Sequence, residues 1–385
     1  MFVDGFMGIK TIDECFYYIQ NGANIKQAEN SGGYPITRIE TTSNDRFNRD
    51  RMGYAGITDL AKYSTYILED DDLLMSHINS VRYLGRTVLY KKIGDEIIIH
   101  GMNLLRLKAD KSIILPKYAK YYFYSYNFRS QLANITKKSV NQASFAVKDL
   151  KRIKIDVPQL ENQKIVINTL DKLQSIITHI RTQLEKLDLL VKARFVEMFG
   201  DPIVNHQGWR TMALEDNATL LNGRAYKQDE LLDSGKYPVL RVGNFFSNRG
   251  WYYSDLELDE DKYCDNGDLL YAWSASFGSQ IWKGGKVIYH YHIWKVLVGN
   301  AYNKQFLCYL LEYATESLMN DTHGIAMMHL TKRGMEKNKF IVPPLELQTQ
   351  FANFVKQVDQ SKSILQQELT QTQTLFNSLM QEYFG

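Results

Sequence analysis

The chain contains one long segment twice, and this repeat limits the possible folds more than any other feature. Residues 157–200 align without a gap to residues 342–385, at a constant offset of 185 positions. Both copies begin with Val-Pro-x-Leu-Glu-x-Gln and end with Glu-x-Phe-Gly. Repetition of a segment this long indicates duplication of a whole structural unit, so we expect the intervening residues to be duplicated as well.

Each copy has the apolar spacing of a long packed helix. In the first copy, apolar residues recur in steps of three and four, the pattern of a helix that packs along its whole length against another helix. Prolines near the start and a glycine at the end bound a helix of about 40 residues, roughly 60 Å long. The second copy has a weaker seam, interrupted by Lys362 and Thr372. The predicted helix-pairing residues are Val166, Leu170, Leu173, Ile177, Ile180, Leu184, Leu187, Val191, Phe351, Val355, Val358, Leu365, Leu369 and Phe376.

The natural partner of one such helix is the other. Because a large segment separates them, we expect an antiparallel coiled coil, although the pattern also permits a parallel pair. The alternative is two ordinary amphipathic helices, each packed on its own domain. A continuous seam of this length needs a partner of similar length, which favours the pair.

The segments between the helices repeat a second pattern. Tyr-Pro-x-x-Arg occurs at 34–38 and 237–241, Asp-Leu-Leu at 72–74 and 268–270, and Asn-Gly at 21–22 and 222–223. EIIIHGMNLLRL at 96–107 matches KVIYHYHIWKVL at 286–297, with His100 aligned to His290. The residues between these points are mostly unalike, so a common framework carries different surfaces.

These repeats predict the domain organisation. We expect globular domains at residues 1–156 and 201–341, and spacer helices at 157–200 and 342–385. The apolar patterns of the domains indicate mixed α/β (α+β) structure, with a strand at Tyr-Pro-x-x-Arg followed by a polar loop. Two copies of one domain joined by paired helices would have pseudo-two-fold symmetry, which suits a ligand with its own local two-fold symmetry, such as duplex DNA.

Composition limits the class of protein. A hydrophobic content of 44% and a charged content of 23% are typical of a globular protein, and no apolar run approaches the length of a membrane span. Three widely spaced cysteines and the absence of a basic, apolar leader lead us to expect a cytoplasmic protein. Residues 1–156 carry 23 basic and 17 acidic side chains, whereas residues 201–341 carry 15 and 17. Charge alone therefore does not identify a nucleic-acid binder.

Motifs of catalysis and cofactor binding are missing from the sequence. It contains no GxxxxGK[ST] phosphate loop and no GxGxxG, and its only Pro-Pro pair, at 343–344, starts a helix instead of forming a methyltransferase motif. His290 and His292 would share one face of a strand, but no third ligand stands at a recognisable spacing, so a packed or DNA-facing pair is preferred to a metal site. We expect no catalytic residues, no metal and no cofactor.

The proline-led helices VPQLENQ and VPPLELQ, the repeated YPxxR and DLL elements and the two-fold layout resemble the specificity subunit of type I restriction-modification enzymes. The resemblance covers essentially the whole chain. It implies that each globular domain is a target recognition domain reading one half of a bipartite site in double-stranded DNA. It also implies that the helices set the gap between the halves and dock two methyltransferase subunits, joined by motor-nuclease subunits. Gln159, where the family often has a second proline, departs from the pattern.

Candidate DNA contacts are polar residues in the loops that follow the repeated strands. Such side chains can reach base edges or phosphates. Arg38 and Arg241 are alternatively framework residues, since both copies share them. The basic residues around 137–154 have a solvated face as their alternative. The candidates are Arg38, Thr41, Thr42, Ser43, Asn44, His77, Asn79, Lys137, Lys138, Asn141, Gln142, Arg241, Asn244, Ser247, Asn248, Arg249, Ser274, Ser276, His323 and His329.

Two other functions remain open. The chain could be a stand-alone bipartite DNA-binding protein without methyltransferase partners, such as a regulator. It could also be a protein scaffold in which the helices are the working part, and apolar, undiverged domain surfaces would favour that. The polar loops differ sharply between the copies, which favours DNA reading.

Overall fold

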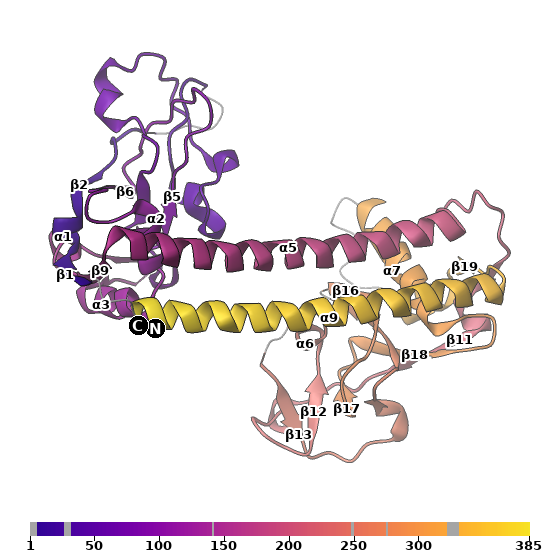
Figure 1. Cartoon of the computed structure of the whole chain (residues 1–385). Helices are drawn as coiled ribbons and strands as arrows, with labels where there is room; N and C mark the ends of the chain where they lie inside the picture. The colour runs from indigo at the N-terminus through magenta and orange to yellow at the C-terminus, as the bar shows by residue number, and fades with distance from the viewer. Residues whose placement is uncertain (1–5, 27–31, 141, 248–249, 275, 322–330) are drawn as a thin grey trace. The chain divides into compact units, whose positions relative to one another are not determined.

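A computed structural model describes residues 6–26, 32–140, 142–247, 250–274, 276–321 and 331–385. The chain forms two compact units, unit 1 (residues 1–180 and 367–385) and unit 2 (residues 181–366). Helices α5 (Leu160–Phe199) and α9 (Leu345–Phe384), each of 40 residues, contribute to both units (Figure 1).

Unit 1 is built on a four-stranded antiparallel sheet. Its order is β2 (Phe16–Asn21), β6 (Leu104–Ala109), β3 (Leu73–Ser76) and β5 (Thr87–Leu89). The pair β1 (Phe6–Thr11) and β9 (Lys154–Pro158) joins the start of the domain to the start of α5, and a small sheet contains β4 (Ile78–Asn79), β8 (Ala143–Ser144) and β7 (Lys137–Lys138). The helices are α1 (Ile12–Cys15), α2 (Pro116–Tyr122), α3 (Tyr126–Ile135) and α4 (Val147–Leu150), with 3₁₀ segments η1 (Ile39–Asp45), η2 (Arg49–Arg51), η3 (Ala61–Tyr66) and η4 (Val81–Tyr83).

Unit 2 repeats this design. Its main sheet has the order β11 (Ala218–Asn222), β18 (Ile293–Val298), β15 (Leu269–Ser274) and β16 (Ser276–Ile281), and β10 (Thr211–Ala213) pairs with β19 (Lys339–Ile341). A second sheet has the order β13 (Tyr252–Ser254), β12 (Tyr237–Leu240), β17 (Val287–Tyr289) and β14 (Tyr263–Cys264). The helices are α6 (Val242–Phe246), α7 (Lys304–Asp321) and α8 (Lys332–Lys337), with 3₁₀ segments η5 (Leu214–Asp216), η6 (Gln228–Glu230) and η7 (Glu260–Lys262).

The main sheets of the two units match strand for strand. In unit 1, Leu73 of β3 faces one core cluster and Leu74 faces another. In unit 2, Leu269 and Leu270 of β15 divide between two clusters in the same way. Side chains alternate across a strand, so both faces of each sheet are covered, which explains the continuous apolar run after the repeated aspartate.

The second sheet is where the copies differ. Unit 2 has ladders between β13, β12, β17 and β14. Unit 1 has only single bridges at the matching positions, joining Gly53, Ile36, Ile99 and Ile67 in the same order. The predicted strand at 34–38 is therefore wrong for unit 1, where Ile36 makes isolated bridges, and correct for unit 2, where Tyr237–Leu240 is a strand. In both copies the chain then enters a short helix, η1 or α6, where we predicted a loop.

The structure also corrects one alignment. Leu74 pairs with Arg106 in unit 1, and Leu270 pairs with Lys295 in unit 2. Arg106 thus corresponds to Lys295, one position away from the ungapped sequence match. The slip arises because three residues separate His100 from β6 and two separate His290 from β18.

Both long helices enter the cores. In unit 1, Val166 and Leu170 near the start of α5 share a core with Phe384 at the end of α9. In unit 2, Phe195 and Phe199 near the end of α5 pack on Phe351 near the start of α9, with ring centroids 5.4 and 5.7 Å apart. The start of one helix meets the end of the other in each unit, so α5 and α9 run antiparallel.

The predicted pairing positions lie on the covered side of these helices. Ile177, Ile180 and Val191 are buried on α5, as are Val355 and Val358 on α9. The remaining predicted pairing residues, Leu173, Leu184, Leu187, Leu365, Leu369 and Phe376, are half-buried. Lys362, at one interruption of the seam, forms an ion pair of 2.5 Å with Asp188 of α5.

Candidate nucleic-acid interface

The repeated arginine begins a short helix in each unit. Arg38 is the N-cap of η1, and its backbone N–H donates to Oγ1 of Thr41 (2.8 Å). Arg241 is the N-cap of α6, and its backbone N–H donates to Oδ1 of Asn244 (3.3 Å). A side chain three residues on satisfies the same backbone donor in both copies. The two arginines therefore hold equivalent places in the framework.

The repeated Asn-Gly has a steric cause. A Cβ at position 22 would collide with the carbonyl oxygens of His100 and Gly101, and a Cβ at position 223 with those of Tyr289 and His290. Only glycine allows the backbone to approach so closely. This glycine places the segment around the repeated histidine directly beside the end of β2 or β11.

A repeated ion pair joins the two central strands. Arg106 Nε donates to Oδ2 of Asp72 (2.6 Å), and the same oxygen accepts the backbone N–H of Glu69 (2.7 Å). In unit 2, Lys295 Nζ lies 2.9 Å from Oδ2 of Asp268, which accepts the backbone N–H of Asp265 (2.9 Å). Burial raises the pKa of Asp72, against the lowering effects of the Glu69 hydrogen bond and Arg106. The pair fixes the register of the sheet and the turn before it.

A repeated glutamine fastens each long helix to its domain, a role that the sequence reading missed. Gln163 of α5 accepts the backbone N–H of Leu115 (2.8 Å) and donates to the carbonyls of Ile113 and Pro158 (both 2.9 Å). On α9, the matching Gln348 accepts from Asn303 (2.8 Å) and donates to Ala301 (3.0 Å) and Pro343 (2.8 Å). Both glutamines are fully buried. Their recurrence at the offset of 185 was the signal in the sequence.

Four of the predicted DNA contacts are buried in the described structure. Thr41 Oγ1 donates to the carbonyl of Arg51 (2.9 Å), and Thr42 Oγ1 donates to that of Ile39 (2.9 Å). These hydroxyls hold η1 together instead of facing solvent. Ser274 is buried at the end of β15, and His77 packs edge-on against Phe145, where burial lowers its pKa. The hydroxyls of Thr41 and Thr42 thus serve the fold of the loop.

The other candidates reach the surface to different degrees. Asn44, Lys137, Lys138, Gln142, Ser247 and Ser276 are exposed. Arg38, Ser43, Asn79, Arg241 and Asn244 are half-buried. Asn141, Asn248, Arg249, His323 and His329 lie outside the described residues.

Some of these side chains gather in space. In unit 1, Asn79 and Lys138 both pair with Ala143 in the small sheet, which places Lys137 and Gln142 beside them. In unit 2, the carbonyl of Phe245 on α6 accepts a hydrogen bond from Gln280 of β16 (2.8 Å), so α6 lies on the β15–β16 hairpin that carries Ser276. Each unit thus groups exposed polar residues on short connections beside its framework.

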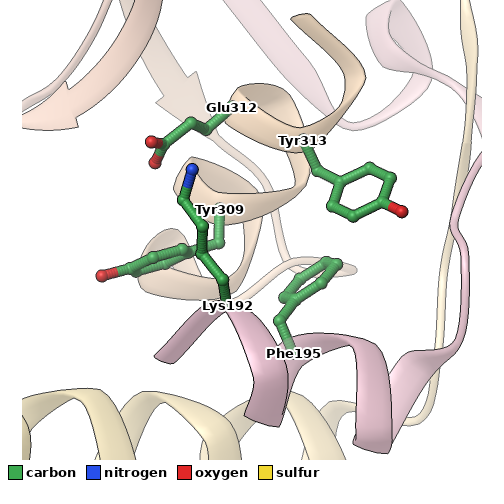
Figure 2. A pocket seen from close by; sticks show the side chains of 5 residues that line it. All are labelled: Lys192, Phe195, Tyr309, Glu312 and Tyr313. Atoms are coloured by element: carbon green, nitrogen blue, oxygen red, sulfur yellow. The ribbon is translucent and has the colours of Figure 1, made fainter. Parts of the chain in front are cut away.

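Unit 2 has one small hollow and two wider, more open ones, the latter lined by residues of β16, α7 and α9. A hollow lined by Lys192, Phe195, Tyr309, Glu312 and Tyr313 of unit 2 encloses about 20 Å³, room for one water (Figure 2). Figure 2 shows the Lys192 and Glu312 side chains pointing toward one another at its edge. No group of three or more His, Cys, Asp or Glu side chains among the described residues could hold a metal ion.

The three cysteines lie in the interior of the two units. All three are buried, and burial raises the pKa of Cys15 to about 11 and those of Cys264 and Cys308 to about 12. A thiol with a raised pKa holds little of the nucleophilic thiolate. In the described part of the chain, every helix is too short or too polar to span a membrane.

Known proteins share this organisation. Residues 7–188 and 206–373 each match the model of the type I restriction modification DNA specificity domain. A protein described as the MjaX type I restriction enzyme specificity subunit of Methanocaldococcus jannaschii is 28% identical over 399 residues, covering 97% of this chain and 91% of the relative. The EcoKI specificity subunit of Escherichia coli is 22% identical over 210 residues, covering 53% of this chain and 44% of that protein.

A solved structure has the same fold. The S subunit of a type I restriction-modification system from M. genitalium aligns over 100% of this chain and 98% of its own, with a TM-score of 0.59 and 14% identity. That likeness concerns the fold alone. The two matches to the family model cover most of the sequence and divide it as the internal repeat does. This chain therefore belongs to the type I restriction-modification specificity subunits, which are non-catalytic DNA-recognition components.

Proposed function

We propose that each unit reads one half of a bipartite site in double-stranded DNA, and that α5 and α9 set the gap between the halves. The observation that carries this proposal is a shared framework with divergent surfaces. The glutamine clamps, the Asn-Gly contacts and the Asp–Arg or Asp–Lys pairs recur in both units. The exposed connections beside them differ in length and sequence, as two readers of different half-sites would require.

The partners follow from the same family. The chain would dock two methyltransferase subunits, and motor-nuclease subunits would join that complex in the cytoplasm. Exposed apolar side chains on the long helices, among them Ile165, Leu189 and Ile364, support a docking role for these helices. One solved neighbour with full coverage and a TM-score of 0.59 comes from work on complex assembly in the type I restriction-modification system.

A methylation map tests the proposal. The chain is expressed with a methyltransferase subunit of a type I system in a methylation-free host, and modified adenines are located by single-molecule sequencing. We expect a two-part motif with an unspecified gap, and its loss when this chain is deleted. Methylation that persists unchanged without the chain would contradict the proposal. Absence of methylation in both strains, with DNA binding retained, would favour the stand-alone DNA-binding protein.

The spacer role has its own test. Four residues inserted after Thr182 in α5 and after Gln367 in α9 would lengthen each helix by about 6 Å, or one to two base pairs. We expect the same two half-sites with a gap longer by one to two base pairs. A control insertion of four residues after Gly94, an exposed turn of unit 1, should leave the gap unchanged. An unchanged gap in the helix variant would show that the helices do not set the spacing.

A further inference from the structure

A short turn follows the repeated histidine in each unit, and its length and sequence differ between the two copies. In unit 1, Gly101–Asn103 connect His100 to β6; in unit 2, Tyr291 and His292 connect His290 to β18. The flanking segments match, because residue 99 bridges residue 36 in parallel as residue 288 pairs with residue 239. The turns themselves differ in length and in every side chain.

Each turn lies beside the repeated arginine. In unit 1, the backbone N–H of Thr37 donates to the carbonyl of Ile99 (2.9 Å), and Thr37 Oγ1 accepts the backbone N–H of Gly101 (2.9 Å). Arg38 is therefore the direct neighbour of the residue that holds the turn. In unit 2, the backbone N–H of His290 donates to the carbonyl of Leu240 (2.9 Å), directly before Arg241. Burial, His292 and Arg241 together lower the pKa of His290 to about 4, which agrees with a nearby guanidinium.

Both turns carry a large apolar side chain that the core does not cover. Met102 is 43% exposed and Tyr291 is 38% exposed. The unit 2 turn is held in place, because Trp273 Nε1 donates to the carbonyl of Tyr291 (2.8 Å). The His292 ring lies 3.9 Å from the Tyr291 ring and 5.1 Å from that of Trp273, measured between centroids. Each turn therefore places an exposed apolar side chain near the arginine that recurs in both units. This combination suits a partner that carries both negative charges and apolar groups.

Duplex DNA presents that combination in its major groove. Phosphate contacts position a protein without reading sequence, whereas base-edge contacts, including apolar contact with the thymine methyl, specify it. Residues common to both units suit the first role, and residues that differ suit the second. Methionine can offer only apolar contact, while tyrosine and histidine can also form hydrogen bonds.

We propose that the turns at Met102 and at Tyr291–His292 read bases in the major groove, with Arg38 and Arg241 on neighbouring phosphates. Met102 is assigned to a thymine methyl in one half-site, and Tyr291 with His292 to a base edge in the other. This inference rests on the proposed function and deepens it, because it names the specificity-determining residues. It also explains why a framework histidine recurs while the residues after it do not.

The test uses the complex with its methyltransferase and compares Met102→Ala and Tyr291→Ala with the parent chain. Both side chains are partly exposed, so the variants should fold. We expect Met102→Ala to lower discrimination at one position of one half-site by about 10- to 100-fold, and Tyr291→Ala to do the same in the other half only. Arg38→Ala should instead lower methylation by a similar factor at all sites of the parent motif and at near-matching sites. Ile93→Ala in unit 1 and Leu297→Ala in unit 2 are matched controls, exposed apolar residues away from the turns.

The outcomes separate this inference from the function on which it rests. A parent chain that directs no methylation would contradict the proposed function itself. A parent with a bipartite motif, and both alanine variants with that motif unchanged, would overturn only the assignment of the turns. A uniform loss of methylation in both alanine variants, without change of sequence preference, would also overturn it, and would indicate that the turns contact a protein subunit.

Discussion

The central ion pair of unit 1 and that of unit 2 have the same geometry in different surroundings. Asp72 and Arg106 have side chains that are 3% and 1% exposed, whereas Asp268 and Lys295 have side chains that are 26% and 17% exposed. Both aspartates also hold the backbone N–H three residues earlier. Both copies keep an aspartate and a basic residue at the same two positions. The pair in unit 1 is buried from water, whereas the pair in unit 2 is partly solvated.

The difference in burial between the two ion pairs shows which parts of the framework tolerate divergence. A buried charge that loses its partner is left uncompensated, whereas a partly exposed charge is screened by water. The glutamine clamps, by contrast, are fully buried in both units with matching partners. Attachment of the helices is thus equivalent in the two units, and the sheet interior is not.

The largest effect is expected from the central pair. Asp72→Ala should destabilise unit 1 by about 3 kcal/mol, because the buried guanidinium of Arg106 then keeps only its polar contacts with the exposed Glu69 carboxylate (3.4 Å) and the Thr65 carbonyl (3.1 Å). Asp268→Ala should destabilise unit 2 by about 1 kcal/mol, because Lys295 is better solvated. Hydrogen exchange resolved to each unit measures the two values separately, which a single melting curve does not. Equal losses in both units would contradict the comparison.

The helix seam gives the next contrast. Ile177 of α5 is buried, and the residue at the offset of 185 is Lys362 of α9, half-buried and paired with Asp188. Ile177→Ala should cost about 2–4 kcal/mol through lost burial and a cavity. Lys362→Ala should cost less than about 1 kcal/mol. Denaturant midpoints compared with the parent check this order, and a larger loss for Lys362→Ala would reverse our view of the seam.

The glutamine clamps should behave alike. Gln163→Ala and Gln348→Ala each remove three hydrogen bonds and leave buried backbone groups unpaired, at a cost of about 2–3 kcal/mol in each unit. Exchange protection of Leu115 and Asn303, the two donors, should fall in the corresponding variant only. As a matched control, Gln174→Ala alters an exposed glutamine of α5 and should change neither. A strong effect in one unit and none in the other would break the equivalence.

The smallest expected effect is a loss of stability at low pH, caused by protonation of the repeated histidines His100 and His290. Burial lowers the pKa of His100 to about 3 and, with His292 and Arg241, that of His290 to about 4, below the ordinary value of about 6.5. The unfolded chain binds these protons first, so the stability that depends on the neutral rings is present above pH 6.5 and is lost as pH falls toward 4 for His290 and toward 3 for His100.

Between pH 7 and pH 5, His100 should account for about 1–2 kcal/mol of that loss. His100→Gln can preserve donation to the Leu104 carbonyl, which Nε2 of His100 now bonds (2.8 Å). Exchange protection of unit 1, measured at both pH values, should then depend less on pH than in the parent. An unchanged pH dependence would show that His100 is not the titrating group.

The sequence predicted the architecture well because repetition and apolar periodicity reflect the fold directly. The two long helices and the family were readable from Val-Pro-x-Leu-Glu-x-Gln and the seam. Whether an individual polar residue is buried or exposed could not be predicted from the sequence. Thr41 and Asn44 follow the same arginine, yet Thr41 is buried as a cap and Asn44 is exposed with a φ of +57°. A capping side chain and a surface side chain have the same polarity, and only tertiary contacts separate them.

The alignment within the sheet had a similar limit. The turn after the histidine has three residues in unit 1 and two in unit 2, so Arg106 occupies the position equivalent to Lys295. An ungapped alignment hides this shift of one residue. Because successive residues face opposite sides of a strand, a one-residue slip changes which side chains are compared. Turn lengths diverge freely at the surface, and the residues that we assign to base reading lie in such a turn.

The most direct test of the account replaces residues 201–341 with a second copy of residues 1–156 and maps methylation with the same methyltransferase. If each unit reads one half-site independently, the motif should become an interrupted palindrome in which both halves are the half-site of unit 1. Intact exchange protection of both units would establish that the variant is folded. A folded variant that keeps the parent motif, or acquires one with two dissimilar halves, would contradict the claim that each unit carries its own specificity.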